Sequence, residues 1–168
     1  VQKYLPEFEG PGRDKVRVQD LLTHTSGLPD MLPENVKLRQ ANAPLTEFTQ
    51  GAMTTPLLFE PWTSFTYSSM GTLLAATIVE RVAQMPLGQF EQKELFEPLQ
   101  MKHSSLGLGD RPLADTARVQ GDSFAESEKD LERYGANSVY LRKLGHPWGG
   151  MHSTALDLGI FLQMFLNE

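Results

Sequence analysis

The sequence contains no cysteine and has fewer basic than acidic side chains. Without cysteine the chain can form no disulfide, cysteine nucleophile, thiolate zinc site or iron–sulfur cluster. Its 15 Lys and Arg against 21 Asp and Glu give a formal net charge of −6, which argues against nucleic acid or an anionic membrane surface as a partner. No apolar run reaches the roughly 20 residues that a membrane-spanning helix needs. These absences, with 40% hydrophobic and 21% charged residues, indicate an acidic globular chain.

Several common functional motifs are also missing. The sequence has no G-x-S-x-G, H-E-x-x-H, G-x-G-x-x-G or P-loop motif, so nothing indicates those hydrolase, zinc-protease or nucleotide sites. The four histidines do not show metal-ligand spacing, and the nearest pair, His146 and His152, is six residues apart. We therefore interpret them as loop histidines and expect neither a metal nor a cofactor.

The apolar pattern predicts a mainly helical fold with irregular loops and at most short strands. The clearest helix is 67–84, where apolar residues recur every fourth position and no charge precedes Glu80. We expect further helices at 16–24, 45–53, 87–99 and 154–167. The helices 67–84 and 154–167 are nearly all apolar, so we expect both to be buried. Ser153 or Thr154 should cap the last one, with Asp157 in the capping-box position.

Two long segments show no clear periodicity. Residues 28–45 contain three prolines and are expected to be irregular. Residues 100–150 are expected to form a solvent-facing excursion with at most a short strand. The acidic stretch within it, GDSFAESEKDLE, is interpreted as a solvated loop and not as a binding patch.

Three blocks stand out: LLTHTSGLP (21–29), FTYSSMG (65–71) and PWGGMHSTA (147–155). The second places Tyr67 at the start of the clearest helix. A phenol has a pKa of about 10 and is a poor base at neutral pH. A helix N-terminus and a neighbouring ammonium both favour the phenolate, which can then take a proton from a nucleophile and pass it to a leaving group. Taken alone, a tyrosine at a helix start is more often a packing residue.

In this order, the three blocks resemble the serine β-lactamase-like hydrolases, which include class C β-lactamases, DD-peptidases and related carboxylesterases. The resemblance covers essentially the whole chain. It implies a site built from S-x-x-K, Y-x-N and a late K-T-G or H-x-G strand, where serine attacks a carbonyl, Lys and Tyr move protons, and water deacylates. It further implies a small ester, amide or peptide-like substrate, no cofactor, and a bacterial location outside the cytoplasm.

Five positions are candidates for the site, and the resemblance carries over to the first two of them. Tyr67 matches the family tyrosine. Ser69 occupies the place of the substrate-binding asparagine, and its hydroxyl lacks the paired donor and acceptor of an amide, which favours an esterase-like branch. Trp148, Gly149 and Gly150 are candidates for the border of the substrate cleft, with a plain turn before a helix as the alternative. The Thr, His and Ser of LLTHTSG are expected to form a structural turn, with Gly27 left-handed, in preference to a Ser–His catalytic pair.

The remaining family motifs are absent. No serine lies three residues before any lysine, so S-x-x-K is missing, as are K-[ST]-G and H-x-G. We therefore expect residues 1–168 to be one incomplete domain: the helical region of the β-lactamase/DD-peptidase fold without its nucleophile region, late strand and main antiparallel sheet. Such a middle portion would be inactive, and its apolar helices would pack together or stay exposed. The alternative is a non-catalytic helical packing or interaction module. The oligomeric state stays open.

Overall fold

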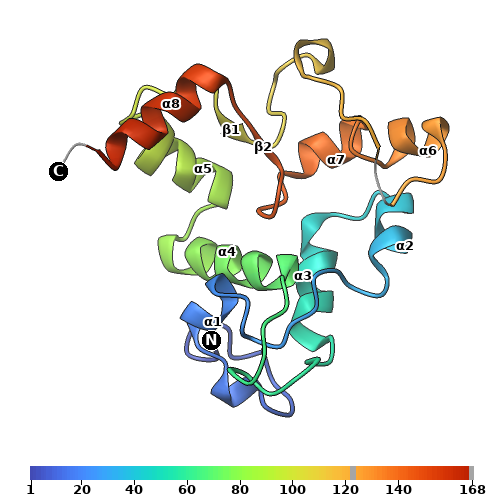
Figure 1. Cartoon of the computed structure of the whole chain (residues 1–168), viewed down its shortest axis with the longest axis vertical. Helices are drawn as coiled ribbons and strands as arrows, with labels where there is room; N and C mark the ends of the chain where they lie inside the picture. Colours follow the sequence, from blue (N-terminus) through green and yellow to red (C-terminus); the bar gives the residue numbers. More distant parts are fainter. Residues whose placement is uncertain (122–123, 167–168) are drawn as a thin grey trace. The chain divides into compact units, whose positions relative to one another are not determined.

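The computed structural model describes residues 1–121 and 124–166 and consists of two compact units, Val1–Gln84 and Met85–Glu168. Helices account for most of the regular structure (Figure 1). The strands found in the described ranges are β1 (Ser105–Leu106) and β2 (Met151–His152). The expected mainly helical chain with short strands is therefore confirmed. In the same ranges, no helix has the length and apolarity needed to cross a membrane.

The first unit is built around one helix. Its elements are η1 (Arg13–Lys15), α1 (Val18–Leu22), α2 (Asn35–Gln40), α3 (Leu45–Thr54) and α4 (Ser69–Ala83). Both α1 and α3 pack against α4 (Figure 1). The face of α4 that carries Met70, Leu73, Leu74 and Ile78 is buried, because residues three and four apart share one side of a helix. The expected buried helix is confirmed, although it begins two residues after Tyr67.

Local bonds fix the start of α4. The Ser68 hydroxyl caps the helix by accepting from the Gly71 N–H at 2.9 Å, and it donates to the Pro29 carbonyl at 3.0 Å. Gly71 also lets α1 approach, since a β-carbon at this position would lie 2.8 Å from the Leu21 carbonyl oxygen. The cap and the close backbone contact together hold the helix end that follows Tyr67.

The N-terminal segment is fastened to the rest of this unit. Leu5 and Phe8 are fully buried, and the buried Arg13 guanidinium donates to backbone carbonyls at the end of α3. On the surface, Arg81 of α4 donates to the Glu7 carboxylate, with Nη1 and Oε2 2.9 Å apart. This hydrogen bond lowers the pKa of Glu7 to about 2. An ion pair thus joins the first residues of the chain to the central helix.

The second unit contains short helices and one two-stranded ladder. Its remaining elements are α5 (Leu87–Glu91), the π-helix η2 (Gln92–Phe96), η3 (Leu113–Asp115), α6 (Glu128–Arg133), α7 (Val139–Leu144) and α8 (Ala155–Met164). Strands β1 and β2 pair antiparallel, with Ser105 opposite His152 and Leu106 opposite Met151. The ladder pairs residues that are 47 and 45 positions apart in the chain. Its β2 residues Met151 and His152 line the cavity described below.

Several helix expectations need correction. Residues 28–45 contain α2, and residues 100–150 contain α6 and α7, so these segments are less irregular than expected. Each of these helices has six residues, which is too short to show a helical period. The expected helix 87–99 is split into α5 and a π-helix, and that at 16–24 is shortened to α1. Glu126 and Glu128 of the acidic stretch are exposed as expected, although α6 begins among them; residues 122 and 123 lie outside the described ranges.

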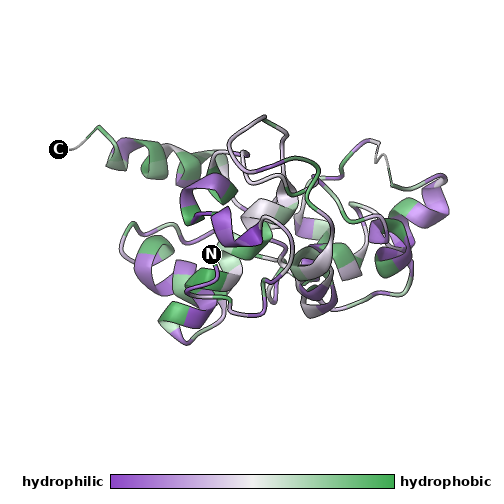
Figure 2. Ribbon diagram, turned by 90° about the horizontal axis from the view of Figure 1, so that it is seen from below, coloured by the Kyte–Doolittle hydropathy of each residue, from purple (hydrophilic) through white to green (hydrophobic). Residues whose placement is uncertain are grey.

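The expectation of a buried C-terminal helix is wrong. The start of α8 is as expected, because the Thr154 hydroxyl accepts from the Asp157 N–H at 3.2 Å. Its apolar side chains are exposed, however, with Leu156 at 80% and Leu162 at 63%. Figure 2 shows apolar residues on successive turns of α8. Only Asp157 is buried among the described residues of this helix. The composition predicts that the helix needs a covering partner, but it cannot show that residues 1–166 supply one.

Candidate functional site

Tyr67 lies directly before the cap of α4, and its side chain is 57% exposed. Its ring packs against the His24 ring, with centroids 4.6 Å apart and planes tilted by 36°. The Nδ1 atom of His24 accepts a hydrogen bond from the Ser68 N–H at 3.1 Å. Phe65 packs edge-on against the same imidazole at 5.9 Å. The His24 ring therefore fixes the backbone on one side of Tyr67 while its face supports the phenol.

The loop that carries His24 is the structural turn expected from the sequence. Gly27 is left-handed at φ 82°, and a β-carbon there would lie 2.3 Å from the Phe59 carbonyl oxygen. The buried Ser26 hydroxyl accepts from the Leu28 N–H at 3.2 Å. Sequence reasoning nevertheless missed that His24 contacts Tyr67. The only signal was that the blocks 21–29 and 65–71 occur together, because a contact across 43 residues leaves no local pattern.

Ser69 is buried rather than open to a ligand. It is 2% exposed, and both its N–H and its hydroxyl donate to Oδ1 of Asp30, at 3.1 and 2.5 Å. A carboxylate at this place satisfies free N–H groups and complements the positive end of the α4 dipole. The Tyr67 hydroxyl, in contrast, makes no hydrogen bond to any residue that the structure describes. Of the two residues, Tyr67 is the one whose side chain is exposed.

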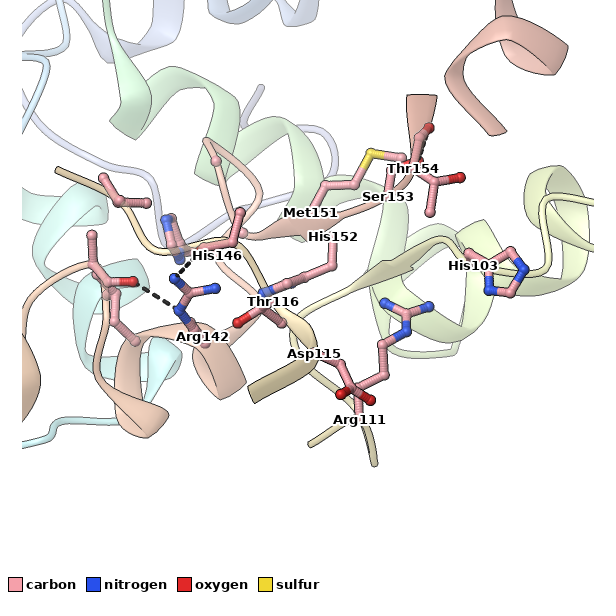
Figure 3. Close-up of a pocket in the computed structure, with 16 residues that line it drawn as sticks. His103, Arg111, Asp115, Thr116, Arg142, His146, Met151, His152, Ser153 and Thr154 are labelled. Carbon is pink, nitrogen blue, oxygen red and sulfur yellow. Dashed lines mark hydrogen bonds between the residues drawn. The ribbon is translucent and has the colours of Figure 1, made fainter. Parts of the chain in front are cut away.

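In the second unit, Gly149 and Gly150 line a cavity of about 640 Å³ (Figure 3). Its charged and titratable lining residues are Arg111, Arg142, Asp115, His103, His146 and His152. Trp148 packs on the His146 ring, with centroids 4.9 Å apart. Gly149 is exposed and Gly150 is buried. The three residues predicted to border a cleft thus lie on or beside this cavity.

Gly150 also has a structural reason to be glycine. A β-carbon at this position would lie 2.6 Å from the His146 N atom, and the Gly150 N–H donates to the His146 carbonyl at 2.7 Å. Its own carbonyl accepts from the Gly107 N–H at 2.8 Å, which extends the β1–β2 ladder. The close approach is therefore between two stretches of backbone, as a turn before a helix requires.

The cavity has a positive electrostatic character. Arg142 is 9% exposed and donates to the carbonyls of Ala136 and Ala117, at 3.0 and 2.7 Å. Burial, followed by the charge of Arg118, lowers the pKa of Arg142. Burial is also the main cause that lowers the pKa of His152, and the charges of Arg142 and Arg111 add to it. Within the described residues, no three His, Asp or Glu side chains gather as metal ligands.

The predicted site residues therefore form two groups. Tyr67 and Ser69 flank the cap of α4 in the first unit, while Trp148, Gly149 and Gly150 lie beside the cavity of the second unit. The residues that sequence reasoning missed are His24 and Asp30 in the first group, and Arg111 and Arg142 in the second. His24, Asp30 and Arg142 each contact a distant segment, whereas Arg111 contacts Ser105, six residues away.

Two amidases and a penicillin-binding protein homologue are among the known proteins that this chain is similar to. The N-acetylmuramyl-L-alanine amidase of Bacillus subtilis is 28% identical over 191 residues, covering 100% of this chain and 43% of that protein. The D-amino acid amidase of Ochrobactrum anthropi, solved with L-phenylalanine amide, superposes with a TM-score of 0.75 at 23% identity, covering 99% of this chain and 47% of that one. A penicillin-binding protein homologue from Caulobacter crescentus gives 0.73 at 21% identity, with 96% and 46% covered.

The chain thus spans less than half the length of each of these relatives. At identities below 25%, the solved structures show a shared fold. The family model described as Beta-lactamase matches residues 1–168, and this match confirms the resemblance carried by the three sequence blocks. The chain belongs to the Beta-lactamase family.

Proposed function

We propose that this chain is the middle portion of a serine hydrolase that forms and hydrolyses an acyl-enzyme, with Tyr67 as its proton-transfer residue. The observation that carries the proposal is the fixed but open phenol. The Tyr67 ring is held by His24 and by the start of α4, while its hydroxyl is free of hydrogen bonds to the described residues. A proton-transfer group needs this combination of a defined position and an accessible oxygen.

In the proposed reaction, a serine outside these residues attacks the substrate carbonyl carbon, and its hydroxyl proton passes to the Tyr67 oxygen. The tetrahedral intermediate then expels the leaving group, which takes the proton from Tyr67, and water later attacks the acyl-serine. The family lysine would favour the phenolate. Because the sequence contains no S-x-x-K, the isolated chain cannot form the acyl-enzyme and should be inactive.

We infer that the substrate contains an amide or peptide bond. Support comes from the relatives, since the Bacillus subtilis and Ochrobactrum anthropi proteins are amidases by name. The alternative is that the substrate is an ester, as in the esterase-like branch of the family. Its support is Ser69, which supplies no amide group and whose hydroxyl is engaged by Asp30. A panel of ester and amide substrates separates the two alternatives by their relative kcat/KM.

We further propose that residues 1–168 form the helical region of the β-lactamase/DD-peptidase fold and that its main antiparallel sheet lies outside them. The exposed apolar side chains of α8 support this, as does the coverage of less than half of each relative. The same exposed helix is also what a non-catalytic interaction module would present to a partner. Activity of the longer protein decides between these two functions.

The decisive experiment uses the protein with the sequences that flank residues 1–168 in its gene. We expect an S-x-x-K motif upstream, labelling by a fluorophosphonate or penicillin probe, and turnover of D-amino acid amides or peptides. Tyr67→Phe should lower kcat by about 100-fold or more, the usual contribution of a general acid–base group. Tyr4→Phe removes a phenol hydroxyl elsewhere in the first unit and should leave kcat unchanged.

Four results would contradict the proposal. The hydrolase function fails if no S-x-x-K lies upstream or if no probe labels the longer protein, and the interaction module is then favoured. The role of Tyr67 fails if Tyr67→Phe retains full kcat. Turnover of nitrocefin or p-nitrophenyl esters by the isolated 168-residue chain would overturn its expected inactivity.

A further inference from the structure

The cavity of the second unit buries a positive charge that no carboxylate of residues 1–121 or 124–166 neutralises. Arg142 of α7 is 9% exposed and forms no ion pair with any described residue. Its Nε and Nη2 groups donate to neutral oxygens of Ala136, Ala117 and Asn137. Its Nη1 group donates to none of the described residues, although a guanidinium carries five N–H donors. A buried charge without a counter-ion is costly, and an anion in the cavity would remove that cost.

Two further groups lie in the same cavity: Arg111 adds a second positive charge, and His152 adds an imidazole. Arg111 donates from Nη1 to the Ser105 hydroxyl at 3.0 Å, and its other N–H groups have no hydrogen-bond partner among the residues that the structure describes. His152 of β2 has a buried Nδ1 atom with no hydrogen-bond partner among the described residues. Figure 3 shows the His152 ring pointing toward Arg142 inside the cavity, and the charges of both arginines act on that ring. The three side chains thus come from three segments and share one cavity.

The remainder of the lining sets the size and polarity of a ligand. A volume of about 640 Å³ falls in the range of small-molecule sites. Val119, Leu141 and Met151 give the cavity apolar walls, and Asp115 is the one carboxylate among the lining residues that the structure describes. Asp115 is exposed, and its charge opposes a multiply charged anion more strongly than a singly charged one.

We propose that this cavity binds a small organic carboxylate with an apolar body, such as the C-terminal residue of a peptide. The carboxylate would accept two parallel N–H donors from Arg111, as a guanidinium allows. It would also accept from the Nη1 group of Arg142, because the Nε and Nη2 groups of that side chain are already engaged. The apolar body would contact Leu141, Val119 and Met151. This inference goes beyond the proposed function, because binding requires no nucleophile and can be measured on the 168-residue chain.

Trp148 provides the readout, since its ring packs on His146, which lines the cavity. In a Trp62→Phe background it is the single tryptophan of the chain. N-acetylleucine, with a free carboxylate, should change its fluorescence in a saturable way. N-acetylleucinamide, which has the same apolar body and no charge, should bind about tenfold more weakly or not at all, since hydrogen bonds between charged groups are the stronger ones.

Arg111→Gln tests the site most cleanly, because Arg142 also holds loop carbonyls and its loss could unfold the unit. We expect Arg111→Gln to weaken N-acetylleucine binding by about tenfold. Arg133→Gln removes the same charge from an exposed position of α6 outside the cavity and should leave Kd unchanged. Circular dichroism of each variant verifies that the fold is retained.

The proposal is overturned if the carboxylate and the amide bind equally, if neither binds, or if Arg111→Gln leaves Kd unchanged. Inorganic phosphate that binds more tightly than N-acetylleucine would overturn the carboxylate assignment. None of these results bears on the hydrolase proposal, whose test measures turnover and probe labelling in the longer protein.

Discussion

The two most apolar helices of the chain have opposite environments. In α4, Leu73 and Leu74 are buried beneath α1 and α3, whereas in α8, Leu156 and Leu162 face solvent. Both helices begin with a hydroxyl cap, so their local signals are alike. The difference is the presence of neighbours, because no other described element packs extensively on α8. Apolar composition therefore shows that a helix needs a partner, and tertiary structure decides whether it has one.

The largest expected effect comes from removing one buried leucine. Leu74→Ala should lower the free energy of unfolding by about 2–5 kcal/mol, because it deletes apolar contacts and leaves a cavity in the first unit. Leu162→Ala makes the same chemical change on exposed α8 and should cost less than about 0.5 kcal/mol. Urea unfolding followed by circular dichroism measures both. A cost for Leu162→Ala close to that of Leu74→Ala would mean that α8 is covered in solution.

An intermediate effect is expected at the helix caps. Ser68→Ala removes a buried hydroxyl that caps α4 and also donates to the Pro29 carbonyl, so it should cost about 2 kcal/mol. Thr154→Ala removes only the cap of α8, where the helix packs against little, and should cost about 1 kcal/mol or less. The same unfolding experiment compares the two. Equal costs would show that the tertiary bond of Ser68 adds no stability.

The smallest effect concerns the ion pair between Glu7 and Arg81. The pKa of Glu7 is lowered from its ordinary 4.5 to about 2, so the folded state favours the carboxylate. Its contribution to stability is therefore present above pH 4.5 and is lost as the pH falls through about 2. Because both side chains are nearly half exposed, solvent screening limits the contribution to less than about 1 kcal/mol.

The measurement compares the chain with Glu7→Gln at pH 5.5 and at pH 2. The difference in unfolding free energy between them should be present at pH 5.5, shrink at pH 2, and weaken in 1 M salt. A difference that is independent of pH would show that the carboxylate charge does not stabilise α4. No described surface ion pair involves α8, so this test sharpens the contrast between the two helices.

Sequence reasoning succeeded where structure is local. The period of α4 and the capping role of Thr154 depend on residues within one or two turns, and both were found. The left-handed Gly27 was found for the same reason, since a turn after a short helix favours glycine. The helices α2, α6 and α7 were missed because six residues show less than two helical turns.

The site was predicted less completely, because its parts meet through tertiary contacts. Tyr67 was identified from its place before a helix and from the family resemblance. Its support by His24 and the engagement of Ser69 by Asp30 join segments about 40 residues apart, which no periodicity reveals. Arg111 and Arg142 likewise share a cavity only after the β1–β2 ladder and α7 have formed. The net charge of the whole chain is negative, so it gave no indication of this local positive site.

The hydrogen bond from the Ser68 N–H to His24 Nδ1 has a consequence for dynamics. This amide is protected from solvent by an imidazole nitrogen and not by a carbonyl of a neighbouring turn. Its exchange with deuterium therefore follows the opening of the His24 ring, whereas the amides inside α4 follow the unfolding of the helix. Because the same ring supports Tyr67, the exchange rate of this one amide reports how long the phenol stays in place, without substrate or nucleophile.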